Sequence, residues 1–133
     1  MMDGQDWFYT DVVKEHFIRP RNAVLFDSQI EDMDAVGEVG SPACGDIMKI
    51  WIKVKDGKII KCMWKTFGCA SAIASTSMLS EMVIGMTLED AIKIKAKDIL
   101  DKLGGLPSKK IHCSVLGDQA LKKAIENYLD KHQ

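Results

Sequence analysis

The sequence predicts an α+β fold, a small three-stranded antiparallel sheet with about five helices packed on one face. After one helix near the start, strand-like alternation fills the first half of the chain and helical spacing fills the second half. This order is typical of helices packed against an antiparallel sheet. No repeat or linker interrupts it, and 133 residues suit one hydrophobic core. We therefore expect a single domain over residues 1–133.

The three strands are expected in the first half of the chain. A helix over residues 9–18, closed by Pro20, and a polar stretch come first. A short strand is expected at 35–40, and Asp56-Gly57 is a tight-turn pair that joins the other two strands into a hairpin. In the second strand Met48, Ile50, Ile52 and Val54 alternate with Lys49, Trp51, Lys53 and Lys55, and the third strand runs from Ile59 to Lys65.

The later helices are expected from caps and from apolar spacing. Thr87 with Asp90 resembles a capping box that opens a helix over 88–94, and a short helix is expected at 98–103. Gly85 ends an earlier helix, and an amphipathic helix closes the chain. The apolar positions are Met78, Leu79, Met82 and Val83 in the earlier helix and Leu121, Ala124, Ile125, Tyr128 and Leu129 in the last one.

The charge and the hydropathy argue against several classes of protein. The formal net charge is -1, so no overall field favours nucleic acid or an anionic membrane. The N-terminus lacks the features of a secretory signal, and no apolar run is long enough to span a bilayer. We expect a cytoplasmic protein, in which the four cysteines serve metal or thiol chemistry rather than disulfides.

Cys44 and Cys69 are the first two candidate ligands. Cys44 lies in a loop before a strand, where Pro42 stiffens the approach and Gly45 lets the backbone come close to a ligand. Asp46, two residues later, points the same way in an extended chain. Cys69 stands where a helix begins, and the free N–H groups of a helix start favour a thiolate. For both cysteines the alternative is an ordinary structural role.

Cys113 is the third candidate and is expected just before the final helix. Lys109 and Lys110 precede it, and cationic neighbours favour a thiolate. His112 can serve as a nitrogen ligand, although a lone histidine in an apolar context more often has a structural role.

The other thiol and the other histidines are expected to be structural or exposed. Cys62 lies within the third strand between Ile60 and Trp64 and is expected to be an inert core residue. We expect His16 on the surface and His132 in a frayed tail. The sheet lysines are expected to form a solvated face.

Three motifs give the chain a resemblance to a known family. In order they are GSPACGD, KTFGCASAIASTS and IHCSVL, and Tyr9 and Pro20-Arg21-Asn22 precede them. Together they resemble the IscU/NifU N-terminal family of iron–sulfur assembly scaffolds over nearly the whole chain. The resemblance implies a scaffold, not an enzyme, that accepts iron and persulfide sulfur. It implies a transient two-iron two-sulfur cluster that passes to apo-proteins, with zinc as an alternative occupant.

The resemblance also implies a ligand set and partners. Cys44, Cys69 and Cys113 match the family's three cysteine ligands, Asp46 its acidic residue and His112 its histidine. The fourth ligand stays open between Asp46, His112 and a group from a partner. The implied partners are a cysteine desulfurase, apo iron–sulfur recipient proteins, and a frataxin-like or chaperone partner.

Departures from the family pattern bear on the expected chaperone partner and on the type of scaffold. Relatives often carry Leu-Pro-Pro-Val-Lys for an Hsp70-type chaperone, whereas this chain reads Leu106-Pro107-Ser108-Lys109-Lys110, which argues against that chaperone. Ala70 replaces a usual glycine. Zinc-dependent sulfur acceptors related to the family carry an insertion before the third cysteine and lack the histidine, whereas His112 is present here.

The residue types favour two mechanistic steps. Three thiolates are soft ligands suited to iron–sulfur chemistry, and the harder oxygen of Asp46 is expected to hold a cluster less firmly, so that it can leave. Cys113 is expected to accept the persulfide sulfur. Three alternatives stay open: a zinc-dependent sulfur relay, a thiol peroxidase with Cys69 as nucleophile, and a zinc-stabilised interaction module.

Overall fold

A computed structural model describes residues 11–41, 46–67, 70–104 and 111–131, without the side chains at positions 41, 46, 67, 70–71 and 111–116. It confirms the predicted α+β fold. The elements in chain order are α1 (Asp11–Ile18), the 3₁₀ helix η2 (Asp27–Ile30), β1 (Ala35–Ser41), β2 (Asp46–Lys55), β3 (Lys58–Phe67), α2 (Ala70–Val83), α3 (Leu88–Ala91), α4 (Ala96–Leu103) and α5 (Ile111–Lys131).

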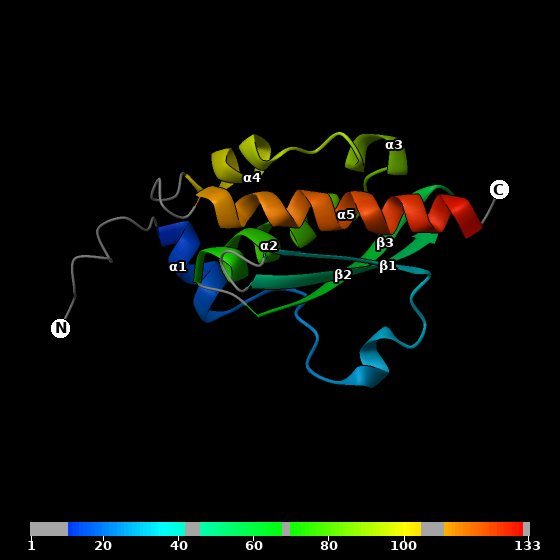
Figure 1. Ribbon diagram of the computed structural model, residues 1–133, viewed down its shortest axis with the longest axis horizontal. Helices are drawn as coiled ribbons and strands as arrows, with labels where there is room; N and C mark the ends of the chain where they lie inside the picture. Colours follow the sequence, from blue (N-terminus) through cyan, green and yellow to red (C-terminus); the bar gives the residue numbers. More distant parts are fainter. Residues whose placement is uncertain (1–10, 42–45, 68–69, 105–110, 132–133) are drawn as a thin grey trace.

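The sheet is antiparallel and has the strand order β1-β2-β3. α5 lies along β1 and β2, and α2 packs on β3 and α5, so these two helices cover one face of the sheet. α1 packs against α2, and α4 packs against both α2 and α5 (Figure 1). The η2 segment lies on the opposite side of the sheet from α5. The core therefore lies between the sheet and the α2–α5 layer.

The alternation predicted for β2 is confirmed. Met48, Ile50 and Ile52 are each at most 1% exposed and form the centre of the core. In β3 the alternation breaks, because Lys53 pairs with Lys61 whereas Val54 pairs with Ile59. Ile60 is thus the extra residue of a β-bulge. As a result Ile60 is 41% exposed, and its two flanking inward positions, Ile59 and Cys62, are buried.

The close approach of α5 to the sheet depends on Gly37. A Cβ atom at this position would overlap the backbone of α5 at Ala120 and Ala124. The absence of a side chain therefore lets the helix lie directly on β1. Asn127 of the same helix donates a hydrogen bond of 2.7 Å to the Val36 carbonyl, which satisfies one edge group of β1.

The residues that follow α1 bind both α2 and the edge of β3. The backbone N–H of Arg21 donates to Ser77 Oγ at 2.8 Å, and the side-chain amide of Asn22 donates to Ser80 Oγ at 3.0 Å. Trp64 Nε1 donates to the Arg21 carbonyl at 2.7 Å. Asn22 adopts a positive φ of 63°, a conformation that asparagine tolerates better than most residues. The Pro20-Arg21-Asn22 motif thus has a structural role here.

His16 is not a surface residue, contrary to the prediction. It is only 5% exposed, because α1 turns it towards α2. Its Nδ1 lies 2.7 Å from Ser77 Oγ, and its Nε2 lies 3.3 Å from Glu81 Oε1. Burial and the Arg21 charge lower the pKa of His16, outweighing the opposite effect of Glu81 and Glu15. Sequence position alone could not show this, because the burying surface belongs to a distant helix.

Several predicted boundaries differ from the structure. The helix expected over 88–94 ends at Ala91, although Thr87 caps it as predicted by accepting a hydrogen bond from the Asp90 N–H. The helix expected at 98–103 begins at Ala96, and Gly104 ends it with a left-handed φ of 80°. The final helix begins at Ile111, so the third cysteine lies inside it. The η2 helix was not predicted.

Gly37→Ala is expected to lower the free energy of unfolding by about 1–3 kcal/mol, because the added methyl group forces α5 away from β1. Urea unfolding followed by circular dichroism measures the change. Glu38→Ala, at the next and exposed position, is the matched control and should stay within about 0.5 kcal/mol of the wild type. Equal stability of the two variants would contradict the close-packing account.

The stability of the fold is expected to fall as the pH is lowered through the ordinary histidine pKa of 6.5. The reason is that the unfolded chain binds a proton on His16 more readily than the folded chain does. The stability that depends on an uncharged His16 is fully present above pH 6.5 and is lost progressively below it. Urea unfolding between about pH 7.5 and pH 5.5 tests this, and His16→Gln should flatten the profile. His132→Gln is the control; a flattening in the control alone would contradict the assignment.

Candidate metal centre

The five predicted site residues belong to three junctions of the chain. Cys44 falls between β1 and β2, and Cys69 falls between β3 and α2; both lie outside the described residues. Asp46 is the first residue of β2, and His112 and Cys113 are the second and third residues of α5. For these three residues the structure describes the backbone but not the side chains. The ligand set therefore stays a prediction.

The register of the sheet brings the first two junctions to one end. Ser41, the last residue of β1, pairs with Asp46, and Ile47 pairs with Phe67, the last residue of β3. The segments that carry Cys44 and Cys69 therefore depart from the same end of the sheet. Only positions 68 and 69 separate β3 from the start of α2.

α5 brings the third junction towards the same end. Gly117 sits against Leu79 of α2 and Met48 of β2, two residues from Asp46. The first turn of α5 extends beyond this contact towards the left-hand end of the sheet in Figure 1. Contrary to the prediction, Cys113 does not precede the helix but lies in its first turn. Three segments far apart in the sequence thus meet at one end of the fold.

Two helix starts lie at this end of the molecule. α2 begins at Ala70 and α5 at Ile111. The first four N–H groups of a helix have no partner within the helix and carry a partial positive charge. Such positions favour thiolates, which are the metal-binding and sulfur-accepting form of cysteine. The described side chains contain no group of three or more His, Cys, Asp or Glu that could hold a metal ion, and the five candidates are not among them.

Cys62 is a buried core residue, as predicted. It is 1% exposed, and burial raises the pKa of its thiol to about 12. The group stays protonated at neutral pH and is therefore a poor nucleophile and a poor metal ligand.

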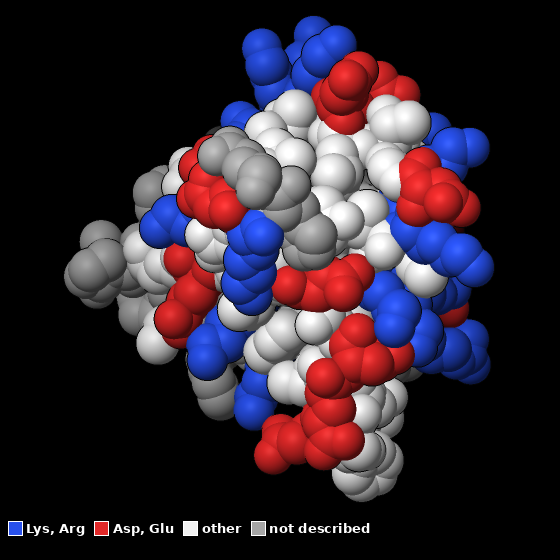
Figure 2. All heavy atoms as spheres, turned by 90° about the vertical axis from the view of Figure 1, so that its right-hand side faces the viewer, with Lys and Arg blue, Asp and Glu red and all other residues white. Residues whose placement is uncertain are grey.

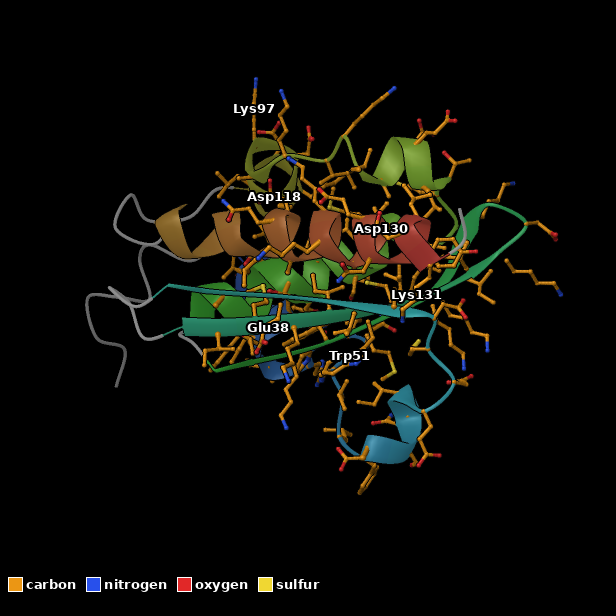
Figure 3. The ribbon with its side chains drawn as sticks, turned by 45° about the vertical axis from the view of Figure 1, so that its right-hand side comes forward. Glu38, Trp51, Lys97, Asp118, Asp130 and Lys131 are labelled. Carbon is orange, nitrogen blue, oxygen red and sulfur yellow. The ribbon has the colours of Figure 1, made fainter. Side chains whose placement is uncertain are left out.

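Asp118 is an ionisable residue that the sequence did not single out. It lies one turn and a half after Cys113 in α5 and is 6% exposed. Its Oδ1 is buried and has no hydrogen-bond partner among the described residues, while Oδ2 lies 3.9 Å from Lys122 Nζ. Figure 3 places Asp118 on the side of α5 that faces α4.

Burial raises the pKa of Asp118, and the Lys122 charge and backbone hydrogen bonds from Asp118 and Gln119 offset only part of this effect. The apolar spacing of α5 places Asp118 beside the core but cannot show that α4 covers it.

No described helix is both long enough and apolar enough to cross a membrane.

Comparison with known proteins identifies relatives over nearly the whole chain. The family model described as "NifU-like N terminal domain" matches residues 8–133. The chain is 50% identical over 124 residues to "Iron-sulfur cluster assembly scaffold protein IscU 1" of Archaeoglobus fulgidus, a match that covers 93% of this chain and 78% of that protein. It is 47% identical over 126 residues to the scaffold protein IscU of Escherichia coli strain K12, covering 94% and 97% of the two chains.

A longer relative and a solved structure agree with this assignment. The chain is 51% identical over 126 residues to "Nitrogen fixation protein NifU" of Nostoc, a match that covers 92% of this chain but only 42% of that protein. The crystal structure of the N-terminal part of a NifU-like protein from Brucella abortus has the same fold, with a TM-score of 0.72 at 21% identity over 95% of this chain and 97% of that chain. This chain therefore belongs to the family of NifU-like N-terminal domains.

Proposed function

We propose that this chain is a scaffold on which an iron–sulfur cluster is assembled and then transferred to apo-proteins. The observation that carries the proposal is the meeting of the three ligand-bearing junctions at one end of the sheet. Family membership supports it, because relatives of similar length bear the name of iron–sulfur cluster assembly scaffolds. The chain acts in this proposal as a carrier of its cargo rather than as a turnover catalyst.

The proposed ligands are Cys44, Cys69 and Cys113. Three thiolates match the softness of iron and suit a two-iron two-sulfur cluster, and the same set would also bind zinc. The fourth ligand is Asp46, His112 or a group from a partner protein. A carboxylate oxygen is a harder donor than sulfur, so Asp46 would make one side of the cluster labile. Lability suits a protein that must release its cargo.

The proposed sulfur donor is a cysteine desulfurase that carries a persulfide on its own cysteine. The thiolate of Cys113 attacks the terminal sulfur of that persulfide, the enzyme's sulfur–sulfur bond breaks, and the enzyme's thiolate leaves. The transferred sulfur then forms a persulfide on Cys113. The start of α5 favours this step, because the free N–H groups of a helix start stabilise the attacking thiolate.

Further partners follow from the same role. Apo iron–sulfur proteins would receive the cluster, and a frataxin-like or chaperone protein would assist. The described chain offers no support for an Hsp70-type chaperone, because residues 105–110 lie outside it and their sequence departs from the family motif.

Serine substitutions at Cys44, Cys69 and Cys113 should each abolish a stable cluster, because oxygen replaces one of three thiolate ligands. Anaerobic reconstitution with a desulfurase, cysteine and ferrous iron, followed by optical and Mössbauer spectra, measures this. Cys62→Ala is the matched control and should keep the cluster, since this thiol is buried and protonated. Full cluster formation in all three serine variants would exclude the proposed ligand set. Zinc retention with no cluster absorbance in the wild type would favour a zinc-dependent sulfur relay.

Cys113 should carry the first persulfide after incubation with a desulfurase and cysteine in the absence of iron. The reason is the position of Cys113 in the first turn of α5. Peptide mass spectrometry after alkylation locates the added sulfur. Cys113→Ser should remove it, and Cys62→Ala should not. A persulfide confined to Cys44 or Cys69 would contradict the assignment.

Asp46→Ala should lengthen the lifetime of the assembled cluster, because it removes the hard oxygen donor beside the thiolates. The decay of cluster absorbance after removal of free iron measures the lifetime, and transfer to an apo-ferredoxin should slow in parallel. Asp27→Ala, on the far side of the sheet, is the control for the loss of one negative charge. Unchanged or faster decay in Asp46→Ala would count against a release role.

A further inference from the structure

Two adjacent apolar residues immediately before η2 are exposed. Leu25 is 76% exposed and Phe26 is 69% exposed. Single exposed apolar residues are common on protein surfaces, but a contiguous apolar patch marks an interaction site more often. We call residues 25–31, which include η2, the 25–31 turn.

Hydrogen bonds of the 25–31 turn hold the backbone that carries these two side chains. Gln29 Oε1 accepts hydrogen bonds from the backbone N–H groups of Leu25 at 2.6 Å and Phe26 at 2.9 Å. The Gln29 N–H donates to the Phe26 carbonyl at 3.0 Å, and the Val24 N–H donates to the Trp64 carbonyl of β3 at 2.9 Å. The backbone beneath the apolar pair is therefore pre-organised, which lowers the entropic cost of binding.

A shallow hollow adjoins the turn and extends the apolar surface. Its volume is about 320 Å³, and its lining includes Gln29, Ile60, Met63 and Ile84. Lys61 also lines it, and the charge of Lys61 is paired with Asp32. Ile60 is 41% exposed and Ile84 is 40% exposed. The β-bulge accounts for the exposure of Ile60, because it turns that residue away from the core.

The turn itself is acidic. Residues 25–32 contain Asp27, Glu31 and Asp32 and no Lys, Arg or His. Asp32 forms ion pairs with Lys53 at 3.1 Å and Lys61 at 3.5 Å. Asp27 and Glu31 are exposed, and within the described ranges neither forms an ion pair. Figure 2 shows Asp and Glu side chains gathered towards the bottom of the view, over the part of the chain around η2.

We propose that the 25–31 turn and the adjoining hollow bind a basic amphipathic segment of a partner protein. The apolar face of such a segment would cover Leu25 and Phe26, and its Lys or Arg side chains would meet Asp27 and Glu31. The negative charge argues against nucleic acid and anionic membranes. It also argues against a second copy of this chain, because two acidic turns would repel one another.

The position of this surface lets it act independently of the candidate metal centre. The turn lies on the side of the sheet away from α5, and the ligand-bearing junctions lie at the left-hand end of the sheet in Figure 1. A partner bound at the turn would leave that end accessible. The proposal does not depend on the identity of the cargo.

A titration with two synthetic peptides tests the proposal. The first is an amphipathic helix of about 16 residues with Leu on one face and Lys on its borders. The second has Glu in place of every Lys. Amide chemical shifts of the full chain, recorded by NMR, should change at the 25–31 turn and around Ile60 and Ile84 with the Lys peptide. The Glu peptide should bind at least about tenfold more weakly, and added salt should weaken the binding of the Lys peptide.

Paired variants separate the apolar and the charged contributions. Two double variants should each weaken the binding of the Lys peptide at least about tenfold. One is Leu25→Ser with Phe26→Ser, and the other is Asp27→Lys with Glu31→Lys. Because these side chains are exposed, the variants should keep the thermal midpoint of the wild type, which a melting curve verifies. The controls are Leu129→Ser for the apolar pair and Glu126→Lys with Asp130→Lys for the acidic pair. The controls should bind within about twofold of the wild type.

Several results would overturn the proposal. One is equal binding of the two peptides, and another is a set of shift changes that lies elsewhere on the chain. A third is a loss of affinity for the Lys peptide that is equally large in the test variants and in the control variants. Binding to anionic lipid vesicles that Phe26→Ser abolishes would instead assign the surface to membranes. A concentration-dependent dimer that dissociates in the Phe26→Ser variant would assign the surface to self-association.

Discussion

The close contact between α5 and β1 is the constraint on which the rest of this fold depends. Gly37 lets the helix backbone lie on the strand without an intervening side chain, and Asn127 then reaches the Val36 carbonyl. This contact fixes the lateral position of α5. The contact of Gly117 with Met48 fixes the position of the helix along the sheet. The start of α5 is consequently directed to the end of the sheet where β1 and β3 finish.

Polar contacts within the helical layer work together with this apolar contact. α2 carries buried hydroxyl groups on Ser75, Thr76, Ser77 and Ser80, an unusual composition for a core helix. Ser77 and Ser80 use them to hold the segment after α1 and the ring of His16. Such contacts are specific but contribute only about 1 kcal/mol each.

These features suit a carrier that must both bind and release. The sheet gives the ligand-bearing junctions a common origin, and the helical layer that covers it buries the carboxyl group of Asp118. The 25–31 turn lies on the other side of the sheet, and its hydrogen bonds fix the backbone that carries two exposed apolar residues. The proposed docking surface and the proposed cluster site therefore lie on different parts of the fold.

The sequence by itself determined the fold class and the hairpin of the second and third strands, and it named the candidate ligands. Local patterns were enough for these features, because alternation, a tight-turn pair and helix caps act over a few residues. Motif order likewise needed no coordinates, and it pointed to the family that the comparisons later showed. Only the tertiary structure decided that His16 is buried, that Ile60 bulges outward and that the carboxyl group of Asp118 is buried. The physical reason is that burial depends on surfaces supplied by distant segments, such as α2 for His16 and α4 for Asp118, which no local pattern contains.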